Sequence, residues 1–435
     1  MRYYSTNRQS DNTTLQDAVV RGLAPDRGLY MPERINTIPK AFFNHIGEMS
    51  LTDIAYVVAN TLFGEDIDSE TLKTIVNDTL NFDIPLVKVD DNRYSLELFH
   101  GPTLAFKDVG ARFMARLLGH FNGSDSRKGD VNVLVATSGD TGSAVANGFL
   151  NVPGVNVFVL YPKDKVSKIQ EAQFTTLGAN ITAIEVDGTF DDCQALVKSA
   201  FMDKELNEKM KLTSANSINV ARFIPQMFYY FHAYAQLMRM GEKLDNVVVA
   251  VPSGNFGNIC AGLIGKRMGL PIKRFIAANN RNDVFYEYLV TGKYNPRKSV
   301  ATIANAMDVG DPSNFARILD LYGNSHDAIA AEISGCTYDD DQIRTTLKDT
   351  FERTGYLLDP HGAVAYRALT ELLEPGEVGV FLETAHPAKF KDTVEGIIGK
   401  EVEVPQRLAA FMNGKKKTVK MNAQFPAFKK YLMSL

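Results

Sequence analysis

A lysine that follows a short apolar run is the first residue in this chain whose setting suggests chemistry. Lys107 lies in the segment His100–Asp108 (HGPTLAFKD), directly after Leu-Ala-Phe and ahead of the helical pattern VGARFMARLL. A lysine held away from water has a lowered pKa and can form a Schiff base with a carbonyl group. A surface lysine whose stem packs on apolar neighbours gives the same spacing. Lys107 is therefore a candidate catalytic residue, and its spacing alone does not decide between these interpretations.

Two glycine-containing segments each join an apolar strand to a helical pattern. The first is Ala136–Ser143 (ATSGDTGS), in which Thr137, Ser138 and Thr141 provide hydroxyl groups, and the second is Pro252–Asn258 (PSGNFGN). Glycine lets the backbone approach a ligand closely, and a helix start presents free N–H groups and the positive end of the helix dipole. Each segment is a candidate site for a phosphate or carboxylate. The alternative is an ordinary helix cap or a tight strand-to-helix turn.

Charge and motif content argue against several other classes of protein. The 435 residues include 47 Lys and Arg and 51 Asp and Glu, which gives a formal net charge of −4. That balance provides no general attraction to nucleic acid or to an anionic membrane, so any anion must be held by a local site. Neither G-x-x-x-x-G-K-[ST] nor G-x-G-x-x-G occurs, which argues against a P-loop ATPase and a nicotinamide enzyme of the usual type. The scattered histidines show no metal-site spacing, so no metal is expected.

Cysteine usage and the apolar segments indicate a reducing compartment. Cys193, Cys260 and Cys336 are odd in number and widely spaced, which predicts three buried small side chains rather than a disulfide framework or a zinc ribbon. The opening residues MRYYSTNRQS lack the apolar core of a secretory signal. Since no run of about 18 apolar residues occurs, no transmembrane helix is expected. We expect a cytoplasmic protein.

Short apolar runs alternate with helical patterns from about residue 95 onward. The runs with strand character are Val131–Ala136, Val155–Tyr161, Ile181–Val186, Asn246–Val251, Ile272–Ala277 and Val378–Leu382. Nearly continuous apolar strands that alternate with helices are typical of parallel sheets covered on both faces. The sequence therefore predicts an α/β fold with two parallel or mostly parallel sheet domains and flanking helices.

The remaining segments set the expected domain boundaries. Thr14–Arg21 and Met49–Leu62 have helical apolar spacing, and Val220–Met240 predicts one long, aromatic-rich buried helix. We expect a mostly helical N-terminal segment over residues 1–90 and a smaller α/β domain over 91–240 that carries Lys107 and the first glycine segment. A larger α/β domain with the second glycine segment would cover 241–435. The run Lys415–Lys417 is expected to be a solvated surface.

Seven segments of the chain resemble those of one enzyme family. HGPTLAFKD resembles the pyridoxal-phosphate lysine motif of threonine synthases, and ATSGDTGSA and SGNFGN follow in that family's order. GLAPDRGLYMPE, NSINVARFIPQ, AMDVGDPSNF and LETAHPAKF resemble further segments, so the resemblance runs from about residue 3 to residue 395. It implies a fold type II, tryptophan-synthase-β-like enzyme in the longer variant with an N-terminal extension. It also implies pyridoxal 5′-phosphate as the cofactor.

The resemblance further implies roles for single residues. Lys107 would form the internal aldimine with the cofactor, and Thr384 would face the pyridine nitrogen. Asp140 stands where shorter relatives have an asparagine near the cofactor 3′-oxygen. The implied ligands of the cofactor phosphate are Gly254, Asn255, Phe256, Gly257 and Asn258. The implied substrate-binding residues are Thr137, Ser138, Thr141, Asn216 and Arg222.

The implied reaction converts O-phospho-L-homoserine and water to L-threonine and phosphate, the last step of threonine biosynthesis. One alternative is a threonine-synthase-like phosphohomoserine lyase, which would release a 2-oxo acid. A same-fold dehydratase is a second, although Asn216 and Arg222 argue against it because its substrates carry no phosphate. A third is a non-catalytic ligand-binding protein, against which Lys107 and Thr384 argue. We expect a small-molecule substrate, with no nucleic-acid or membrane partner; the sequence does not indicate an oligomeric state.

Overall fold

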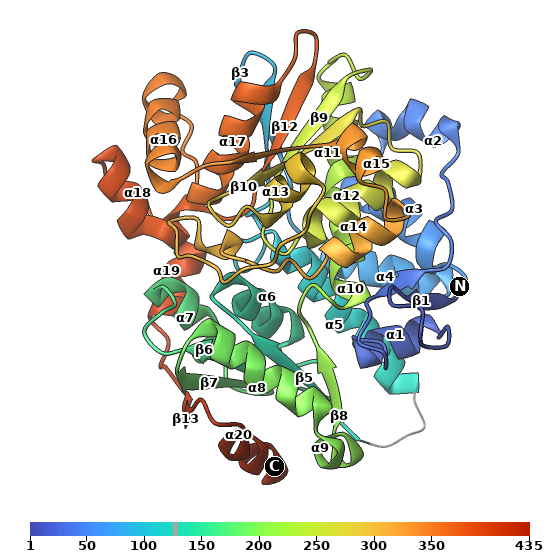
Figure 1. The fold of residues 1–435 in the computed structure, drawn as a ribbon, viewed down its shortest axis with the longest axis vertical. Helices are drawn as coiled ribbons and strands as arrows, with labels where there is room; N and C mark the ends of the chain where they lie inside the picture. The colour runs from blue at the N-terminus through green and yellow to red at the C-terminus, as the bar shows by residue number, and fades with distance from the viewer. Residues whose placement is uncertain (125–128) are drawn as a thin grey trace. The chain divides into compact units, whose positions relative to one another are not determined.

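The computed structural model describes residues 1–124 and 129–435, and the chain divides into two compact units, each built around one large sheet (Figure 1). Unit 1 comprises Met1, Met31–Phe106 and Phe223–Glu403. Unit 2 comprises Arg2–Tyr30, Lys107–Arg222 and Val404–Leu435. Each unit is therefore assembled from segments that are far apart in the sequence.

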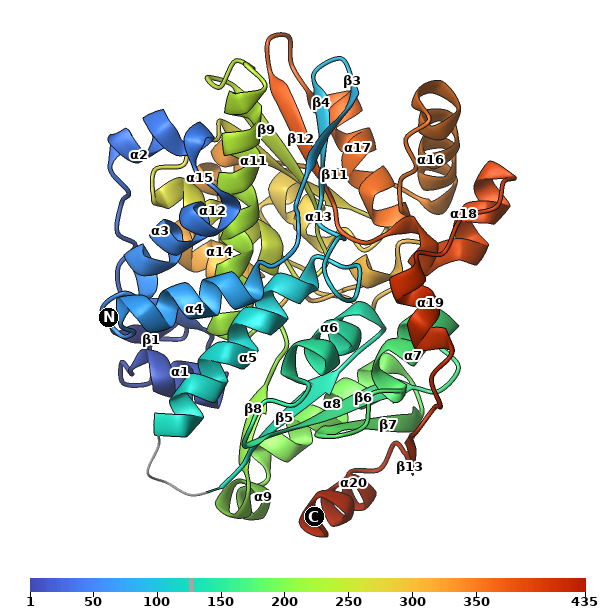
Figure 2. The ribbon, with the colours of Figure 1, turned by 180° about the vertical axis from the view of Figure 1, so that it is seen from behind.

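The sheet of unit 1 has six strands in the order β11-β10-β9-β12-β4-β3. The strands are β3 (Leu86–Asp90), β4 (Arg93–Glu97), β9 (Val247–Pro252), β10 (Arg274–Asn279), β11 (Ile333–Thr337) and β12 (Val378–Glu383). Neighbouring strands are parallel except β3, which pairs antiparallel with β4 at one edge (Figure 2). The central strands β9 and β12 are buried almost throughout, as expected for a parallel sheet covered by helices.

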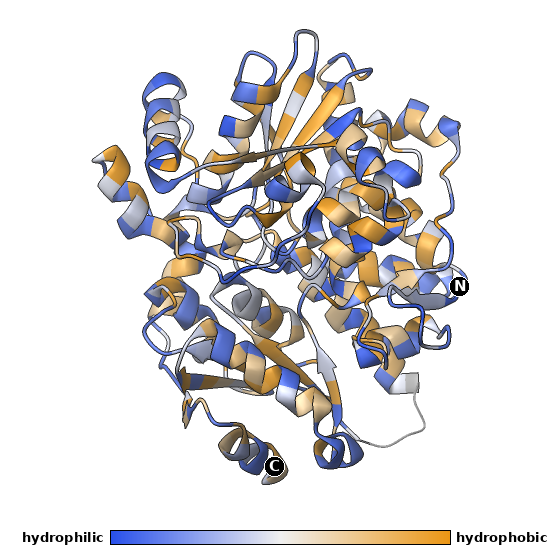
Figure 3. Cartoon of the chain, viewed as in Figure 1, coloured by the Kyte–Doolittle hydropathy of each residue, from blue (hydrophilic) through white to orange (hydrophobic). Residues whose placement is uncertain are grey.

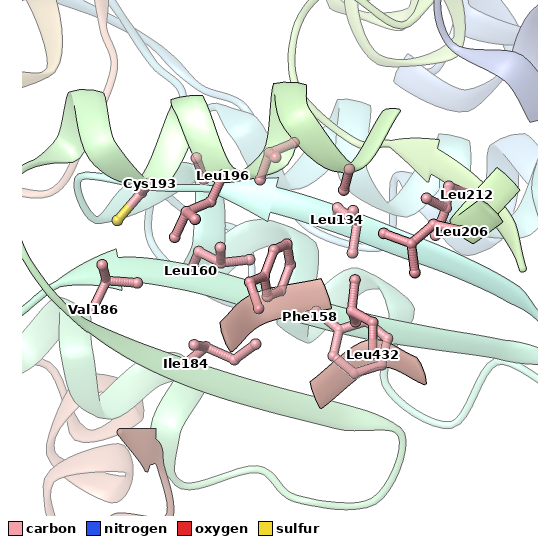
Figure 4. Packing of buried hydrophobic residues seen from close by; sticks show 14 residues of the cluster. Leu134, Phe158, Leu160, Ile184, Val186, Cys193, Leu196, Leu206, Leu212 and Leu432 are labelled. Atoms are coloured by element: carbon pink, nitrogen blue, oxygen red, sulfur yellow. The ribbon is translucent and has the colours of Figure 1, made fainter. Parts of the chain in front are cut away.

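The sheet of unit 2 has five parallel strands in the order β13-β7-β6-β5-β8. The strands are β5 (Val131–Ala136), β6 (Val155–Pro162), β7 (Ile181–Asp187), β8 (Lys211–Ser214) and β13 (Val419–Asn422). One face packs against Cys193 and Leu196 of α8 and Leu432 of α20, which meet Leu160 and Ile184 of the sheet (Figure 4). Figure 3 shows β5 and β9 as mostly apolar, because both strands lie inside their units.

Helices cover both sheets. Those of unit 1 are α2 (Lys40–His45), α3 (Leu51–Phe63), α4 (Ser69–Thr79), α11 (Phe228–Arg239), α12 (Gly257–Arg267), α13 (Val284–Thr291), α14 (Phe315–Leu321), α15 (His326–Glu332), α16 (Asp340–Thr354), α17 (Pro360–Leu372) and α18 (Lys391–Ile398). Those of unit 2 are α1 (Leu15–Arg21), α5 (Lys107–Ser124), α6 (Asp140–Phe149), α7 (Lys168–Thr175), α8 (Phe190–Met202), α9 (Lys204–Lys209), α19 (Gln406–Met412) and α20 (Phe425–Met433). Helix α10 (Val220–Phe223) spans the boundary between the segment Lys107–Arg222 of unit 2 and the segment Phe223–Glu403 of unit 1. Two short strands, β1 (Tyr3–Ser5) and β2 (Tyr30–Pro32), lie outside both large sheets. None of the helices that the structure describes is long and apolar enough to cross a membrane.

The described residues also form four single-turn 3₁₀ segments, and one of them breaks a helix that the sequence predicts as continuous. They are η1 (Ile46–Glu48), η2 (Ile224–Met227), η3 (Asn305–Met307) and η4 (Pro387–Phe390). Segment η2 divides the stretch Val220–Met240 into α10 and α11. Pro225 lies in this segment, and proline cannot donate the backbone hydrogen bond that an uninterrupted helix needs. The long helix expected there is therefore wrong in its continuity, although its aromatic residues are buried as predicted.

The predicted α/β class is confirmed, and each of the six predicted strands coincides with an observed one to within two residues at either end. The sequence did not predict β3, β4, β8, β11 and β13, which are short or only partly apolar. All three cysteines are free and buried, and burial raises the pKa of each thiol to about 12.

The units differ from the three consecutive segments expected from the sequence, 1–90, 91–240 and 241–435. The reason is strand pairing between distant segments: β4 of the early chain pairs with β12, and β13 near the C-terminus pairs with β7. The expected solvated run Lys415–Lys417 is confirmed, because all three residues are exposed. Within it, the Nζ of Lys416 lies 2.7 Å from an oxygen of Glu185, a buried residue of β7.

Candidate active site

Three loops of unit 1 begin at the same end of its sheet, at the carboxyl ends of neighbouring parallel strands. They follow β4, β9 and β12, which are parallel neighbours, with Glu97 paired to Glu383 and Ala250 paired to Phe381. The carboxyl ends of parallel strands point the same way, and ligands of open α/β sheets bind at that end. The loop after β4 leads to Lys107, the loop after β9 contains Gly254–Asn258, and the loop after β12 begins with Thr384. The topology therefore gathers three of the predicted motifs.

The Gly254–Asn258 loop is shaped for a ligand held by backbone N–H groups. Phe256 has a φ of +63°, a left-handed conformation that is uncommon for a non-glycine residue and typical of functional sites. A Cβ on Gly254 would lie 2.8 Å from the carbonyl oxygen of Ala306, so the backbone approaches too closely for a side chain. No side chain of the described residues caps α12, which begins at Gly257. The first N–H groups of that helix are available to an anion.

Asn258 supplies the clearest sign that the loop fits a phosphate group. Its side chain is buried, and its Oδ1 accepts a hydrogen bond of 2.6 Å from the hydroxyl of Tyr230. Its Nδ2 has no hydrogen-bond partner among the described residues. A buried donor without a partner is costly, so its presence beside a helix start indicates an acceptor that comes from outside the chain. The donors that this loop offers among the described residues are N–H groups, which suit the acceptor oxygens of a phosphate.

The loop is supported from the segment that contains the AMDVGDPSNF motif. The carbonyl oxygen of Asn255 accepts hydrogen bonds from the backbone N–H of Asn314, at 3.2 Å, and from its Nδ2, at 3.0 Å. The Oδ1 of Asn314 in turn accepts from the buried guanidinium of Arg317, at 2.6 Å. The guanidinium also lies 4.0 Å from the ring centre of Phe223. This motif therefore holds the loop in place.

Thr384 lies directly across from the chain that leads to Lys107. The carbonyl oxygen of Thr384 accepts a hydrogen bond of 2.8 Å from the backbone N–H of Phe106, the residue before Lys107. Ala105 and Ala385 form an antiparallel bridge, and Leu104 has a left-handed φ of +58°. Thr384 is buried. Inside unit 1, this backbone pairing therefore holds Phe106, the residue before Lys107, against the loop after β12.

Lys107 itself begins α5 in unit 2, and two predicted substrate-binding residues contact it there. Its Nζ donates a hydrogen bond of 2.9 Å to the Oγ1 of Thr141. Its carbonyl oxygen accepts a hydrogen bond of 3.0 Å from the Nη1 of Arg222. The Nε of Arg222 donates to the carbonyl oxygen of Ala215 at 2.8 Å, and Arg222 is buried. One donor of this guanidinium therefore holds the backbone of Lys107, and another holds the backbone of Ala215.

The first glycine segment, between β5 and α6, is held by one of its own hydroxyls. The buried Oγ1 of Thr137 accepts hydrogen bonds from the backbone N–H groups of Gly139, at 2.9 Å, and Gly142, at 2.8 Å. Ser138 and Thr141 are only partly buried. The three predicted hydroxyl residues therefore differ: one organises the loop, and the other two are reachable at its surface.

Asp140 and Asn216 complete the predicted set in unit 2. Asp140 is buried as the first residue of α6, and its Oδ1 accepts a hydrogen bond of 2.8 Å from the Nε2 of Gln170. Asn216 follows β8, the neighbour of β5, and its Nδ2 lies 3.3 Å from the carbonyl oxygen of Ala136 at the end of β5. The structure therefore brings Lys107, Thr141, Arg222, Asn216 and the glycine segment into one unit.

His100 and His386, which lie beside motif residues, form hydrogen bonds within the protein. The ring of His100 lies 2.7 Å from a carboxylate oxygen of Glu97. The Nδ1 of His386 accepts a hydrogen bond of 3.1 Å from the backbone N–H of Ala388. Burial and the nearby His100 lower the pKa of His386 to about 4, so this ring is neutral at physiological pH.

A buried acidic cluster beneath Thr384 is absent from the sequence-based predictions. Asp359, His361 and Glu383 are almost completely buried, and Glu383 immediately precedes Thr384. Burial, and then the negative charge of Asp359, hold the pKa of Glu383 well above its usual range. The segment Asp359-Pro360 carries a readable signal for a helix start, since Asp is a favoured N-cap and Pro a favoured first residue. That signal predicts a cap only, and not the contacts to other loops.

Comparison with known proteins places these features in a family. Residues 87–381 match the family of pyridoxal-phosphate dependent enzymes, residues 2–80 match the threonine synthase N terminus, and residues 362–432 match the threonine synthase C-terminal region. The chain is 46% identical over 409 residues to a threonine synthase of Haemophilus influenzae, and this alignment covers 94% of each of the two chains.

Solved structures agree with the sequence relatives. The fold is similar to the crystal structure of threonine synthase from Escherichia coli, with a TM-score of 0.93, 42% identity and complete coverage of both chains. It is equally similar to the structure of pyridoxal-phosphate-bound threonine synthase from Brucella melitensis, with a TM-score of 0.93 and 34% identity. That match covers 100% of this chain and 99% of the other.

Proposed function

Because the chain belongs to the threonine synthase family of pyridoxal-phosphate-dependent enzymes, we propose that it converts O-phospho-L-homoserine and water to L-threonine and phosphate. The reaction type is inferred from the family relationship. The single structural observation that best supports the choice of residues is the 2.9 Å hydrogen bond between the Nζ of Lys107 and the Oγ1 of Thr141. It joins the candidate catalytic amine to the loop proposed to bind the substrate anion.

We propose that the Gly254–Asn258 loop holds the cofactor phosphate and that Lys107 binds the cofactor covalently. The backbone N–H groups at the start of α12 and the partnerless Nδ2 of Asn258 match the acceptors of a phosphate. Thr384 would face the pyridine nitrogen, where a neutral hydroxyl leaves that nitrogen less fully protonated than a carboxylate would. When bound, the cofactor supplies an electron sink for negative charge that develops on the substrate.

The residues of unit 2 would bind the substrate and move its protons. We propose that Ser138, Thr141 and Asn216 contact the phosphate and carboxylate of the substrate. Thr137 and Arg222 would support them, because Thr137 bonds to backbone groups of the loop and Arg222 bonds to the backbone of Lys107 and Ala215. When its Nζ is not attached to the cofactor, Lys107 would remove the proton from the substrate Cα and return a proton to it at the end.

Asp140 has a neighbour that suits a positioning role. Its carboxylate accepts from Gln170, and the amide of Gln170 also packs on Gly139, where a Cβ would lie 2.6 Å away. We propose that Asp140 fixes the start of α6 and the turn at Gly139. A direct contact with the cofactor remains a prediction from the family resemblance.

One incubation tests the proposed reaction. Purified protein that carries the cofactor is mixed with O-phospho-L-homoserine, and phosphate, threonine and 2-oxo acid are measured in the same sample. Equal amounts of phosphate and threonine are expected. Phosphate with 2-oxo acid would replace this proposal with the phosphohomoserine lyase, and no phosphate at all would contradict the substrate assignment.

A matched variant tests the role of Lys107 in the same assay. Lys107→Ala should remove turnover and the absorbance of the lysine-bound cofactor together, because both need the same Nζ. The neighbouring Asp108→Asn, with Lys107 intact, is the control for a local disturbance of α5 and should keep that absorbance. Threonine formation by Lys107→Ala at the wild-type rate would contradict the assignment.

The cytoplasmic location predicted from the sequence stays a prediction.

A further inference from the structure

We propose that Asp359 and His361 are positioning residues that hold the loop at Thr384 and the Gly254–Asn258 loop in the geometry needed to bind the cofactor; this rests on the proposed roles of those two loops. The basis is a continuous chain of hydrogen bonds inside unit 1. It starts at the backbone of Ala385, passes through the side chains of Asp359 and His361, and ends at the backbone that packs on Gly254.

Asp359 uses its two carboxylate oxygens in different directions. Its Oδ2 accepts a hydrogen bond of 3.1 Å from the backbone N–H of Ala385, the residue after Thr384. Its Oδ1 accepts from the backbone N–H groups of His361 and, at 2.8 Å, Gly362, and lies 3.1 Å from the Nδ1 of His361. Asp359 is completely buried, and four N–H donors stabilise a negative charge on it. One oxygen therefore fixes the loop after β12, while the other fixes α17 and His361.

His361 connects Asp359 to the segment that packs against the Gly254–Asn258 loop. Its Nε2 lies 3.1 Å from the backbone nitrogen of Ala306, which can only donate, so Nε2 is the acceptor. The ring proton must then sit on Nδ1, where it points to Asp359. The geometry therefore selects one tautomer, and in this tautomer the ring bridges Asp359 and Ala306.

Ala306 connects His361 to the Gly254–Asn258 loop, because its carbonyl oxygen lies close to the Cα of Gly254. A Cβ on Gly254 would meet this carbonyl oxygen at 2.8 Å and the Cα of Met307 at 3.1 Å. The segment is the short 3₁₀ turn Asn305–Met307, which has few bonds of its own. A shift of Ala306 would therefore change the space in which Gly254 and the first N–H groups of α12 lie.

A helix cap alone does not explain these contacts. A capping carboxylate bonds to the first N–H groups of its own helix, as Asp359 does with His361 and Gly362. Its bonds to Ala385 and to the imidazole of His361 lie outside that role. Asp339 provides the comparison in the same unit, since its carboxylate caps α16 through the N–H of Gln342 on the surface.

The first experiment compares Asp359→Asn with Asp339→Asn in the full-length protein. Asparagine has one acceptor oxygen and one donor group, so at position 359 the donor must face the N–H of Ala385 or those of α17. Apoprotein of each variant is titrated with pyridoxal phosphate, followed by absorbance, and thermal unfolding of the apoprotein is recorded separately. We expect Asp359→Asn to weaken cofactor affinity at least about tenfold and Asp339→Asn to leave it unchanged.

The second experiment separates the two bonds of the histidine. In His361→Asn the side-chain amide can still donate to Asp359 but does not reach Ala306. In His361→Gln the longer side chain can still accept from Ala306 but loses the bond to Asp359. Each apoprotein is titrated with inorganic phosphate, measured by protection against thermal unfolding, and with pyridoxal phosphate. We expect His361→Asn to lose more phosphate affinity than His361→Gln.

The outcomes separate this inference from the proposed function. If Asp359→Asn and both His361 variants only lower the unfolding temperature and bind the cofactor as wild type does, the two residues are structural and the inference is wrong. Equal phosphate affinity of the two His361 variants would also overturn it. Asn258→Ala is the reference: if this variant too binds the cofactor normally, then the assignment of the loop has failed, and not only the role of Asp359.

Discussion

The two glycine-containing loops, one in each unit, follow the same plan and are stabilised in opposite ways. Both connect a parallel strand to a helix. In unit 2 the hydroxyl of Thr137 accepts from Gly139 and Gly142, so the loop satisfies its own backbone. In unit 1 the Gly254–Asn258 loop has a left-handed Phe256, an uncapped helix start and a buried Nδ2 without a partner among the described residues. Its support comes from other segments, through Asn314 and Ala306.

This difference matches the ligands proposed for the two loops. A substrate comes and goes in every cycle, so its loop must keep its shape without it. A cofactor stays bound, so its loop can leave donors for the phosphate and depend on the ligand to satisfy them. We infer that the unit 1 loop is completed by its ligand, whereas the unit 2 loop is complete beforehand. The following changes test this contrast, from the largest expected effect to the smallest.

Adding one methyl group to each loop should separate the two functions. Gly254→Ala would place a Cβ 2.8 Å from the carbonyl oxygen of Ala306, which is backbone and cannot move away freely. We expect cofactor affinity to fall about 100-fold, the effect of about 3 kcal/mol of overpacking. Gly142→Ala would place a Cβ 2.5 Å from the Cγ2 of Thr137. This variant should keep its cofactor and show a raised KM for the substrate. Equal loss of cofactor by both variants would contradict the assignment.

Removing one polar group from each loop should affect different measurements. Thr137→Val leaves the N–H groups of Gly139 and Gly142 unpaired, and we expect the apoprotein to lose about 2–4 kcal/mol of stability. Asn258→Ala removes the free Nδ2, and we expect cofactor affinity to fall about 10-fold with a much smaller loss of apoprotein stability.

Tyr230→Phe is the control for the Asn258 variant. It removes the hydroxyl that bonds to the Oδ1 of Asn258 but leaves the Nδ2 in place. Chemical denaturation and cofactor titration of all three variants check the contrast. The account fails if Asn258→Ala destabilises the apoprotein as much as Thr137→Val does while cofactor affinity stays at the wild-type value.

Two buried glutamates, one in each unit, have pKa values that are shifted in opposite directions. The pKa of Glu383 is raised by burial and by the charge of Asp359, so in the folded protein this carboxyl is neutral above the ordinary glutamate pKa of about 4.3. The folded state then binds one more proton than the unfolded state, and stability falls as pH rises from about 4.3 toward the folded-state pKa.

The isosteric change Glu383→Gln removes this dependence. The stability of the variant relative to wild type should therefore increase as pH rises above about 4.3, by up to about 1.4 kcal/mol per pH unit. Denaturation at several pH values measures the slope. A constant difference between the two proteins over this range would show that Glu383 is ionised in the folded state.

The buried glutamate of unit 2 should respond in the opposite direction. Burial of Glu185 acts to raise its pKa, but hydrogen bonds from Lys416 and Tyr161 outweigh burial and lower it. Its stabilising contribution is present above the ordinary glutamate pKa and is lost as pH falls through the lower folded-state value. Because Lys416 is half-exposed, we expect Lys416→Gln to cost only about 1 kcal/mol at pH 7 and less at pH 4. Lys415→Gln is the matched control and should have no effect at either pH.

Much of the fold and the identity of the motifs could be predicted from the sequence, because strands such as Val131–Ala136 are continuous apolar runs. The pairing of β4 with β12 could not, since it joins residues almost 290 positions apart and β4 is partly polar. Pattern reasoning found Lys107 and both glycine loops, because their chemistry is local. It missed Asp359 and His361, whose importance lies in contacts with Ala385 and Ala306 that only the folded chain brings about.

The residue that binds the cofactor is the most direct test of the account. The purified protein with its cofactor is reduced with borohydride, which converts the imine between a lysine and the cofactor aldehyde to a stable amine, and peptides are then analysed by mass spectrometry. The account predicts a pyridoxyl group on Lys107, in the peptide that contains HGPTLAFKD, at close to one per chain. A modified lysine elsewhere, or a cofactor that is bound but leaves Lys107 unmodified, would contradict it.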